Sequence, residues 1–465
     1  MSTTTPLAAW AATLPEPPHR AVLGVSEEPA RAAARLAEAG LGAHHVVYEQ
    51  SGTWHFAAGS ATFDVTATGA TARHGERSWH VPAPEGPLAA VRAALAALRA
   101  ASSRDRTVHG WAAFELAHLL HGDPARAGTE PLLSFLVPSV EITLRPGKAE
   151  VRAGDPAVAA RAATVLGAEA RSATAPQPAP FPATAPLPEA AALLAADPGG
   201  YRASVAATSA DIRAGLLDKA VVSRVVPLPR LPDLGASYVT GRAANTPARS
   251  FLLDLGGWRA AGFSPETVVE VGPEGEVSTQ PLAGTRARTG EAAEDTRLRA
   301  ELYADPKEVQ EHALSVRLAC EELARVCVRG SVAVTEFMAV RERGSVQHLA
   351  SRVAGRLEGG SDAWTAFGAL FPAITATGVP KAAALDALGR HERGPRGLYG
   401  GAVFRSCTSG ALDAALVLRA VLVRGDRAWL RAGAGVMGVS TPAREFDETR
   451  EKLLSVAPHL RFPLS

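Results

Sequence analysis

The chain of 465 residues is long enough for two or three ordinary domains or for one large one. Its 48 Lys and Arg residues nearly cancel its 47 Asp and Glu residues, and the formal net charge of +1 gives no sign of a nucleic-acid or membrane-surface partner. With 47% hydrophobic and 20% charged residues, the composition is that of a soluble globular protein and not of a disordered chain.

Cysteines and targeting patterns point to a reduced compartment. The chain has three cysteines and no CxxC zinc signature, and Cys320 and Cys327 are predicted to share the buried stripe of one helix. The first residues lack the basic region of a signal peptide, and no apolar run approaches the roughly 20 residues that span a bilayer. We therefore expect a cytoplasmic protein.

Elements in the first part of the chain are sparse. Composition predicts a helix over residues 91–101, an apolar stretch over 108–120, and an alternating strand over 138–146. Residues 172–196 begin with a Pro/Ala-rich run, which favours an exposed connector because proline lacks the N–H donor and fixes φ.

Stronger signals follow the connector. Residues 219–229 have the β-branched content of a strand, and Asp305 followed by proline is typical of the start of a helix, here expected over 305–326. Residues 412–435 are predicted to form a hairpin with RGDR at its turn. Strands and helices alternate without a clean βαβ period, which favours a mixed α+β sheet protein.

The segment GAGVMG (433–438) matches the GxGxxG dinucleotide fingerprint only in its letters. It lies near the end of the chain and not in the first turn of a βαβ unit, so a glycine-rich strand end that brings backbone close to another group is the better interpretation. Its bare N–H groups could still bind a small carboxylate.

Two acidic pairs repeat one spacing. Glu308 and Glu311, and later Glu445 and Glu448, lie three residues apart, so each pair occupies one helix face. Together they could converge on a hard cation such as Mg²⁺, which takes oxygen ligands. Spacing alone favours ordinary charged faces, because Glu448 and Lys452 form a favourable i, i+4 pair.

Single polar residues in apolar surroundings are further candidates. Lys219 begins a β-branched run, where a buried amine could act as a base or, more commonly, guard a strand edge. Glu266 is a loop acid or a turn residue. His348 and Arg419 interrupt apolar runs, and a buried arginine needs an anionic partner, which a substrate carboxylate or a structural acid could supply.

Taken in order, these segments resemble the chorismate-utilising enzymes, the family of anthranilate, isochorismate and salicylate synthases. The resemblance covers about residues 200–463 and is strongest to the bacterial salicylate synthases; upstream, only HGWAAFELAH (109–118) matches. It rests on KAVVSRVV, AGFSPETVVEV, QPLAGTRARTG, DPKEVQEHALSVRLACEEL, AVRERGSVQHLAS, FPAITATGVPKAAALDAL, RGLYGGAVF, LDAALVLRA, LRAGAGVM and REFDETREKL, together with RSFLLDLGG.

The resemblance implies one large α+β domain over residues 1–465, in which two big, mainly antiparallel sheets flanked by helices enclose a deep site. Residues 1–171 would be a divergent part of that fold, 172–196 a surface loop, and 197–463 the catalytic core. A small-molecule substrate, chorismate, and a monomeric state are expected, without nucleic acid or membrane.

The resemblance also implies roles for individual residues. Lys219 would be the base that activates water for attack at C2 of chorismate, and Glu266 the acid that protonates the departing C4 hydroxyl. Glu311 and Glu448 would bind Mg²⁺, with Glu308 and Glu445 holding its waters and His312 serving as scaffold. The implied substrate-binding residues are Tyr399 and Arg419 for the pyruvyl carboxylate, Gly433 and Lys452 for carboxylate positioning, and Thr285, His348 and Thr375 around the ring.

Within the family, Lys219 is typical of enzymes that use water, whereas ammonia users typically carry glutamine there. Ala283 stands where aminodeoxychorismate synthases have a nucleophilic lysine, and no amidotransferase domain is fused, so an amidotransferase partner is not expected. Tyr399, Thr375 and Leu418 resemble the choices of salicylate synthases, which favours salicylate and pyruvate as products, with siderophore or other secondary metabolism as the use.

Alternatives to this assignment are an isochorismate synthase that releases its product, an anthranilate-type synthase, and a catalytically inactive relative. Two departures from close salicylate synthases lie near the expected site. Gln280 stands in place of a common glutamate, and MGVSTPAREF replaces an acidic stretch before the second acidic pair. They bear on metal affinity, product ratio or loop closure.

Overall fold

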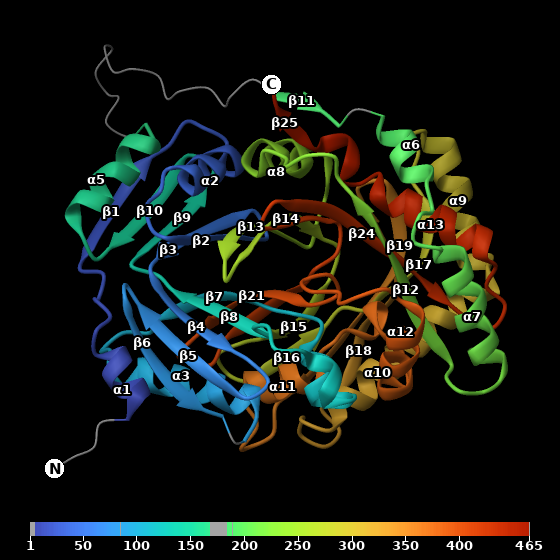
Figure 1. Cartoon of the computed structure of the whole chain (residues 1–465), viewed down its shortest axis with the longest axis horizontal. Coiled ribbons are helices and arrows are strands. Elements are labelled where there is room, and N and C mark those ends of the chain that lie inside the picture. The colour runs from blue at the N-terminus through green and yellow to red at the C-terminus, as the bar shows by residue number, and fades with distance from the viewer. Residues whose placement is uncertain (1–4, 84, 168–183, 188, 465) are drawn as a thin grey trace.

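Two large antiparallel sheets lie between layers of helices at the centre of the computed structural model (Figure 1). The structure describes residues 5–83, 85–167, 184–187 and 189–464. The first sheet has the strand order β1 (His19–Gly24), β10 (Lys148–Ala153), β9 (Val140–Arg145), β3 (Thr53–Gly59), β2 (His44–Gln50), β13 (Arg249–Leu255), β14 (Trp258–Ser264), β23 (Ala420–Arg424), β24 (Arg427–Val436), β12 (Lys219–Pro227) and β20 (Gly378–Val379).

The second sheet is built in the same way from strands that are distant in sequence. Its order is β17 (Leu282–Ala287), β19 (Val346–Arg356), β16 (Glu276–Thr279), β15 (Thr267–Val271), β22 (Leu412–Leu416), β21 (Ala402–Cys407), β7 (Thr107–Ala112), β8 (Leu133–Val137), β4 (Ala61–Val65), β5 (Gly69–His74) and β6 (Arg77–Pro82), with β18 (Ala333–Arg343) paired to β19.

Both sheets join the two parts of the chain. In the first sheet β2 pairs with β13, so that Tyr48 stands opposite Phe251, and in the second sheet β7 pairs with β21. Strands from before and after the Pro/Ala-rich run therefore share continuous ladders, and the molecule is a single α+β domain with two large antiparallel sheets, as expected.

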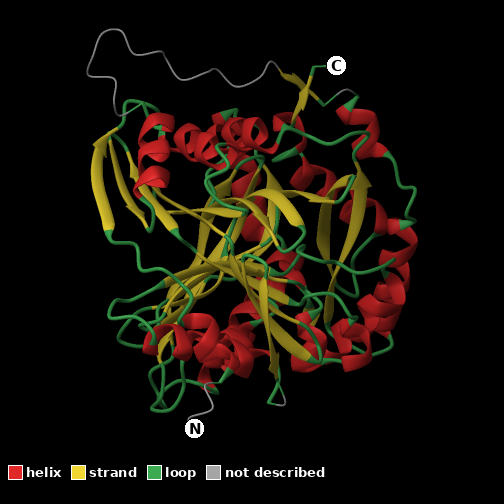
Figure 2. Cartoon of the chain, turned by 60° about the vertical axis from the view of Figure 1, so that its left-hand side comes forward, coloured by secondary structure: helices red, strands yellow, loops and turns green. Residues whose placement is uncertain are grey.

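Helices cover the outer faces of the sheets, and Figure 2 shows them above and below the strands. The helices are α1 (Pro6–Ala11), α2 (Pro29–Glu38), α3 (Pro87–Ala100), α4 (Leu116–His121), α5 (Pro156–Val165), α6 (Ala190–Ala195), α7 (Tyr201–Arg213), α8 (Leu234–Ala244), α9 (Ala292–Ala304), α10 (Pro306–Ala324), α11 (Ala363–Leu370), α12 (Lys381–His391) and α13 (Pro442–Leu453). None of the described helices has the length and hydrophobicity needed to cross a membrane.

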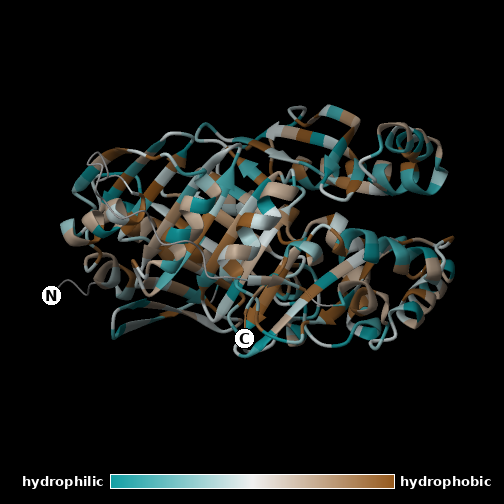
Figure 3. Cartoon of the chain, turned by 90° about the horizontal axis from the view of Figure 1, so that it is seen from above, coloured by the Kyte–Doolittle hydropathy of each residue, from teal (hydrophilic) through white to brown (hydrophobic). Residues whose placement is uncertain are grey.

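The apolar core follows this layering. One cluster, with Tyr48, Trp111 and Phe251, fills the space between the sheets, and two larger clusters lie beneath the helices on either side. Hydrophobic and hydrophilic residues alternate along many of the strands (Figure 3), which places one set of side chains in each layer. The three clusters thereby hold the sheets together around the polar groups at their junction.

One helix and one hairpin expected from the sequence can be compared with the structure. The helix expected over 305–326 is α10, and the Asp305 carboxylate accepts the N–H groups of Lys307 and Glu308 as its N-cap. The expected hairpin over 412–435 is wrong in its first part. Only β23 and β24 form it, whereas β22 pairs with β15 and β21 in the other sheet, because the chain crosses between sheets after residue 416.

The predicted surface loop over 172–196 lies mostly outside the described residues. Its described part contains the short strand β11 (Thr184–Pro186), which pairs with β25 (Arg461–Pro463), and the helix α6. The helix occupies a run of alanine and leucine that follows the last proline, and these residues have high helix propensity.

Candidate active site

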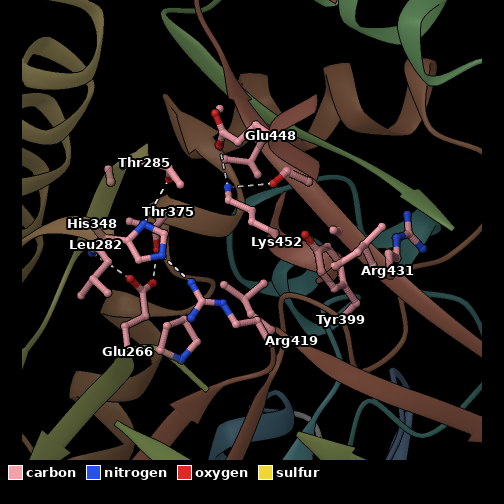
Figure 4. Close-up of a pocket in the computed structure, with 18 of the residues that line it drawn as sticks. Glu266, Leu282, Thr285, His348, Thr375, Tyr399, Arg419, Arg431, Glu448 and Lys452 are labelled. Atoms are coloured by element: carbon pink, nitrogen blue, oxygen red, sulfur yellow. Dashed lines mark hydrogen bonds and ion pairs between the residues drawn. The ribbon is translucent and has the colours of Figure 1, made fainter. Parts of the chain in front are cut away.

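An enclosed pocket is lined by residues of β17, β19, β23 and β24, and most of the predicted site residues line it (Figure 4). These are Glu266, Thr285, Glu311, His348, Thr375, Tyr399, Leu418, Arg419, Gly433, Glu448 and Lys452. Lys219, Glu308 and Glu445 do not line the pocket but are buried against one end of it. The structure thus gathers residues that are more than 200 positions apart in the chain.

Four carboxylates, Glu308, Glu311, Glu445 and Glu448, form what we call the acidic cluster at one end of the pocket. α10 packs on β17 and β19 while α13 packs on β24, and each helix turns its i, i+3 pair toward the other helix. All four side chains are buried, with exposed fractions of 1–7%. The interpretation of these pairs as solvated helix faces is therefore wrong.

Each pair of glutamates also contacts cationic side chains inside the protein. The Lys219 amine lies 2.8 Å from Glu311 Oε1, and the Lys452 amine lies 2.7 Å from Glu448 Oε1. Glu308 contacts the Arg286 guanidinium at 3.2 Å and accepts the Thr285 N–H at 2.8 Å. Because Lys219 is fully buried, it is not an edge residue that guards a strand against aggregation.

Lys307, which sequence analysis did not single out, reaches three of the four carboxylates. Its Nζ lies 3.3 Å from Glu445 Oε1, 3.6 Å from Glu308 Oε1 and 3.7 Å from Glu311 Oε2. Burial acts to lower the pKa of Lys307, but the carboxylates, Glu311 foremost, outweigh it and raise that pKa. The ammonium therefore stays charged among them.

Protonation within the acidic cluster is uneven. Burial and the neighbouring Glu448 raise the pKa of Glu445 to about 7. Burial also acts to raise the pKa of Glu448, but Lys452 and Lys307 lower it to about 2. The cluster thus combines a firmly ionised carboxylate with one that holds its proton more strongly, as expected for close like charges.

The acidic cluster has the donor chemistry of a site for a hard cation. No set of three or more acidic, histidine or cysteine side chains among the described residues is already arranged around a metal position. However, Glu445 Oε2 and Glu448 Oε2 are buried without any hydrogen-bond partner. Unpaired carboxylate oxygens are costly in a protein interior and are the ligands that Mg²⁺ prefers, so these residues fit such an ion.

The glycine-rich strand end explains how the carboxylates fit. A Cβ on Gly435 would lie 2.2 Å from Glu311 Oε1, and a Cβ on Gly433 would lie 3.0 Å from the Tyr399 hydroxyl. The segment GAGVMG therefore serves close approach in β24, and it belongs to no βαβ unit. Gly435 is a site residue that sequence analysis could have found from this signal.

Glu266 lies at the opposite end of the pocket, on the connection between β14 and β15. It is 2% exposed, and its carboxylate accepts the Leu282 N–H at 2.7 Å and the Thr375 hydroxyl. Burial raises the pKa of Glu266 to about 7 against the effect of these hydrogen bonds. A carboxyl group with this pKa can donate or accept a proton near neutral pH.

Arg419 lies beside Glu266 at the crossing between the two sheets. Its backbone has φ of 50°, an unusual value for a residue other than glycine, and its guanidinium points into the pocket (Figure 4). It donates to the Arg343 carbonyl at 2.7 Å and to His348. Burial, together with Arg343, lowers the pKa of Arg419 to about 9. No ion pair joins Arg419 to a carboxylate within the described part of the chain.

His348 links Arg419 to Thr285. Because arginine can only donate, His348 Nε2 accepts, and Nδ1 carries the proton that faces the Thr285 hydroxyl at 3.1 Å. Burial and then Arg419 hold the pKa of His348 well below its ordinary value, so the ring is neutral. We call Glu266, Thr285, His348, Thr375 and Arg419 the arginine end of the pocket.

Other expected residues lie between the two ends. Tyr399 is 4% exposed and packs near Arg431, whose guanidinium carbon is 5.5 Å from the ring centre. Lys452 donates to the Gly433 carbonyl at 2.9 Å as well as pairing with Glu448. Arg431 is another residue that sequence analysis missed, since an arginine in an alternating strand has no distinctive pattern.

Residues expected to support the site are also placed. His312 is fully buried, and its ring nitrogens contact the Ala283 carbonyl at 3.1 Å and the Ser351 hydroxyl at 2.7 Å, as a scaffold residue should. Gln280 is 7% exposed at the strand connection before β17. Within MGVSTPAREF, the Ser440 hydroxyl acts to lower the pKa of Glu445, so this departure bears on the acidic cluster directly.

Comparison with known proteins identifies related sequences and folds. The sequence model described as chorismate binding enzyme matches residues 44–458. A salicylate synthase from Mycolicibacterium paratuberculosis is 51% identical over 264 residues, which are 57% of this chain and 59% of that protein. Anthranilate synthase component 1 from Haloferax volcanii is 38% identical over 265 residues, covering 56% of this chain and 50% of that protein.

A solved structure supports the fold over nearly the whole chain. The structure of a putative 2,3-dihydroxybenzoate-specific isochorismate synthase from Bacillus anthracis superposes with a TM-score of 0.68 at 20% identity, covering 92% of this chain and 98% of that one. The sequence matches span only about half to three-fifths of the curated relatives, so the resemblance in sequence is concentrated in part of the fold.

Proposed function

The chain belongs to the chorismate-binding enzyme family, and on that premise we propose that it is a Mg²⁺-dependent salicylate synthase. It would convert chorismate through isochorismate to salicylate and pyruvate. The observation that carries the proposal is one pocket with a buried lysine at its acidic end and a protonatable Glu266 at its other end. The 51% identity to a salicylate synthase supports the same choice.

The first step needs a base and an acid on opposite sides of the substrate ring. Lys219 would take a proton from water as the water oxygen bonds to C2, and Glu266 would give a proton to the C4 hydroxyl as it leaves. A carboxyl with a pKa of about 7 is suited to this donation near neutral pH. The sum is an isomerisation, because one water enters and one departs.

The Lys219 amine contacts Glu311 and does not line the pocket. Its action as a base therefore requires Glu311 to move off the amine when the site fills. Catalytic contacts are often incomplete without substrate, so this arrangement is consistent with the assigned role. Ser315, whose hydroxyl lies 3.4 Å from the same amine, would help to keep Lys219 in place.

Substrate carboxylates would find cations that the protein leaves available. Arg419 has donors in the pocket and no carboxylate partner among the described residues, so we assign it with Tyr399 to the pyruvyl carboxylate. Glu311 and Glu448 would hold Mg²⁺, with Glu308 and Glu445 supporting it through water. When bound, that ion would neutralise the ring carboxylate.

The second step would be elimination of pyruvate from bound isochorismate, with transfer of the C2 hydrogen to the enolpyruvyl methylene. Here the pocket mainly holds the reactive conformer. Thr285, His348, Thr375 and Leu418 would line the ring, and the neutral His348 would orient Thr285 through its protonated Nδ1. Release of isochorismate before this step is the alternative function.

We also propose that the enzyme acts as a cytoplasmic monomer without an amidotransferase subunit, and that its salicylate enters siderophore or other secondary metabolism. A lysine at position 219 is typical of the family members that use water, which supports water over ammonia as the nucleophile. All three cysteines are free thiols, which is usual for a reducing compartment. Size-exclusion chromatography with light scattering would test the monomer.

The deciding experiment is incubation of purified enzyme with chorismate and Mg²⁺, with products followed by chromatography and salicylate fluorescence. Salicylate with equimolar pyruvate is the expected result. Isochorismate alone would support the alternative synthase. Anthranilate formed only when ammonia is added would instead support an anthranilate-type activity, and unchanged chorismate would indicate an inactive relative.

A further inference from the structure

Lys307 is the cation that joins the two helices of the acidic cluster. It lies in the first turn of α10, and its amine contacts Glu308 and Glu311 on its own helix and Glu445 on α13 at 3.3–3.7 Å. An ordinary i, i+4 ion pair would join one lysine to one carboxylate on an exposed helix face. The Lys307 side chain is instead only 15% exposed.

The local charges show what Lys307 contributes. Glu311, Glu448 and Glu308 each contact a cation other than Lys307, namely Lys219, Lys452 and Arg286, although Arg286 also pairs with Asp305. Lys307 is the only side-chain cation that forms an ion pair with Glu445 within the described residues. Without Lys307, Glu445 would have no ion-pair partner among the described residues, and four buried carboxyl groups would lie close together with one cation fewer, which is unfavourable.

We propose that Lys307 is the resident counter-ion of the acidic cluster, that a divalent cation displaces it, and that this competition sets the affinity of the enzyme for Mg²⁺. The inference rests on the proposed metal site. An ammonium within 4 Å of the carboxylate oxygens of Glu308, Glu311 and Glu445 repels a divalent ion that binds between the same helices.

Two features make the displacement physically feasible. Glu445 Oε2 and Glu448 Oε2 remain unpaired while Lys307 is in place, so the single ammonium does not satisfy the cluster and a second cation gains from entering. The partial exposure of the Lys307 side chain, at the start of a helix, gives the amine a way to water when it leaves.

The test compares Mg²⁺ binding by calorimetry without chorismate for wild type, Lys307→Met and Lys307→Arg, with unfolding temperatures measured with and without Mg²⁺. Lys307→Met removes the charge and keeps an apolar stem. It should bind Mg²⁺ on the order of tenfold more tightly. Its unfolding temperature should fall below that of wild type without metal and return toward it with Mg²⁺. Lys307→Arg, which keeps the charge, should bind Mg²⁺ no more tightly than wild type.

Lys381→Met is the matched control. Lys381 is also a buried lysine paired with a glutamate, at 2.8 Å from Glu322, but it lies outside the pocket. Its loss should lower the unfolding temperature equally with and without Mg²⁺ and leave Mg²⁺ affinity unchanged. A Lys307→Met enzyme that behaved like this control, or bound Mg²⁺ more weakly than wild type, would overturn the proposal.

Failure of folding is also informative. If Lys307→Met and Lys307→Gln both remain unfolded even with Mg²⁺, Lys307 is a purely structural residue and the proposal falls. The proposed reaction fails separately. Wild type that binds Mg²⁺ but makes no salicylate would overturn the reaction while the Lys307 results still decide the counter-ion. Wild type that binds no Mg²⁺ would overturn the counter-ion role.

Discussion

The acidic cluster and the arginine end of the pocket handle buried charge in opposite ways. In the acidic cluster each carboxylate contacts a lysine or arginine of the protein, so its charges are largely balanced before any ligand arrives. At the arginine end, Glu266 contacts only neutral donors, and Arg419 contacts a carbonyl and a neutral histidine. The first end contains its own counter-charges and leaves two carboxylate oxygens unpaired, whereas the second end has an arginine without an anionic partner among the described residues.

The largest effect is expected from removing Lys219, the proposed catalytic base at the acidic end of the pocket. Lys219→Ala should lower kcat by about 10³-fold, because the water would lose its proton acceptor. Chorismate binding, measured by calorimetry, should remain largely intact because Arg419 is untouched. Turnover at the wild-type rate in this variant would remove Lys219 from the role of base.

Glu266→Gln tests the acid at the arginine end and should lower kcat/KM by about 10²-fold, since the amide cannot protonate the leaving hydroxyl. In wild type the protonated acid is lost as pH rises through about 7, so kcat/KM should fall above that pH. The residual activity of the variant should lack this descending limb. A pH profile that kept the limb in Glu266→Gln would assign it to another group.

Glu448→Gln separates metal binding from the rest of the site. Loss of this firmly ionised carboxylate should weaken Mg²⁺ binding by about 10- to 100-fold, while enzyme saturated with chorismate and high Mg²⁺ regains part of its activity. Calorimetry and a Mg²⁺ titration of the rate would measure this. An unchanged titration would exclude Glu448 from the metal site.

Arg419→Met tests how the unpaired guanidinium at the arginine end affects substrate binding and stability. We expect KM for chorismate to rise about tenfold, because a charge-assisted contact to a carboxylate is lost. The free energy of unfolding should rise by about 1 kcal/mol in the ligand-free protein, because a buried cation without an anionic partner is removed. Denaturant unfolding of the ligand-free variant checks the second effect, and a less stable variant would contradict it.

The last effect concerns the pH dependence of stability and leaves turnover aside. The folded-state pKa of Glu266 is raised to about 7, so folding favours its protonated form, and its contribution to stability declines as pH rises from about 4.5 through 7. Wild type should lose at most about 3 kcal/mol more than Glu266→Gln across that range. Unfolding curves at pH 5 and 8 for both proteins would measure the difference.

Local signals in the sequence predicted local structure well. Asp305 followed by proline located the start of α10, and the RGDR turn located the β23–β24 hairpin. The same alternation could not tell that β22 pairs in the other sheet, because period-two patterns do not specify a partner strand. The crossing that orients Arg419 was therefore not predictable from the pattern.

For the site residues too, local features were predictable from the sequence and long-range contacts were not. The i, i+3 spacing correctly placed each glutamate pair on one helix face, but burial and the meeting of the two pairs depend on packing over more than 100 residues of sequence. Lys307 was missed because a lysine beside a glutamate in a first turn is typical of exposed helices. Arg431 gave no signal either, since its contacts come from distant segments.

The sharing of both sheets between the two parts of the chain has a consequence for synthesis. β2 and β7 leave the ribosome long before β13 and β21, their partners across the ladders, have been translated. Until then, apolar strands of the first part present open edges, which attract other chains. Nascent chains that stall before residue 249 should be the most dependent on chaperones.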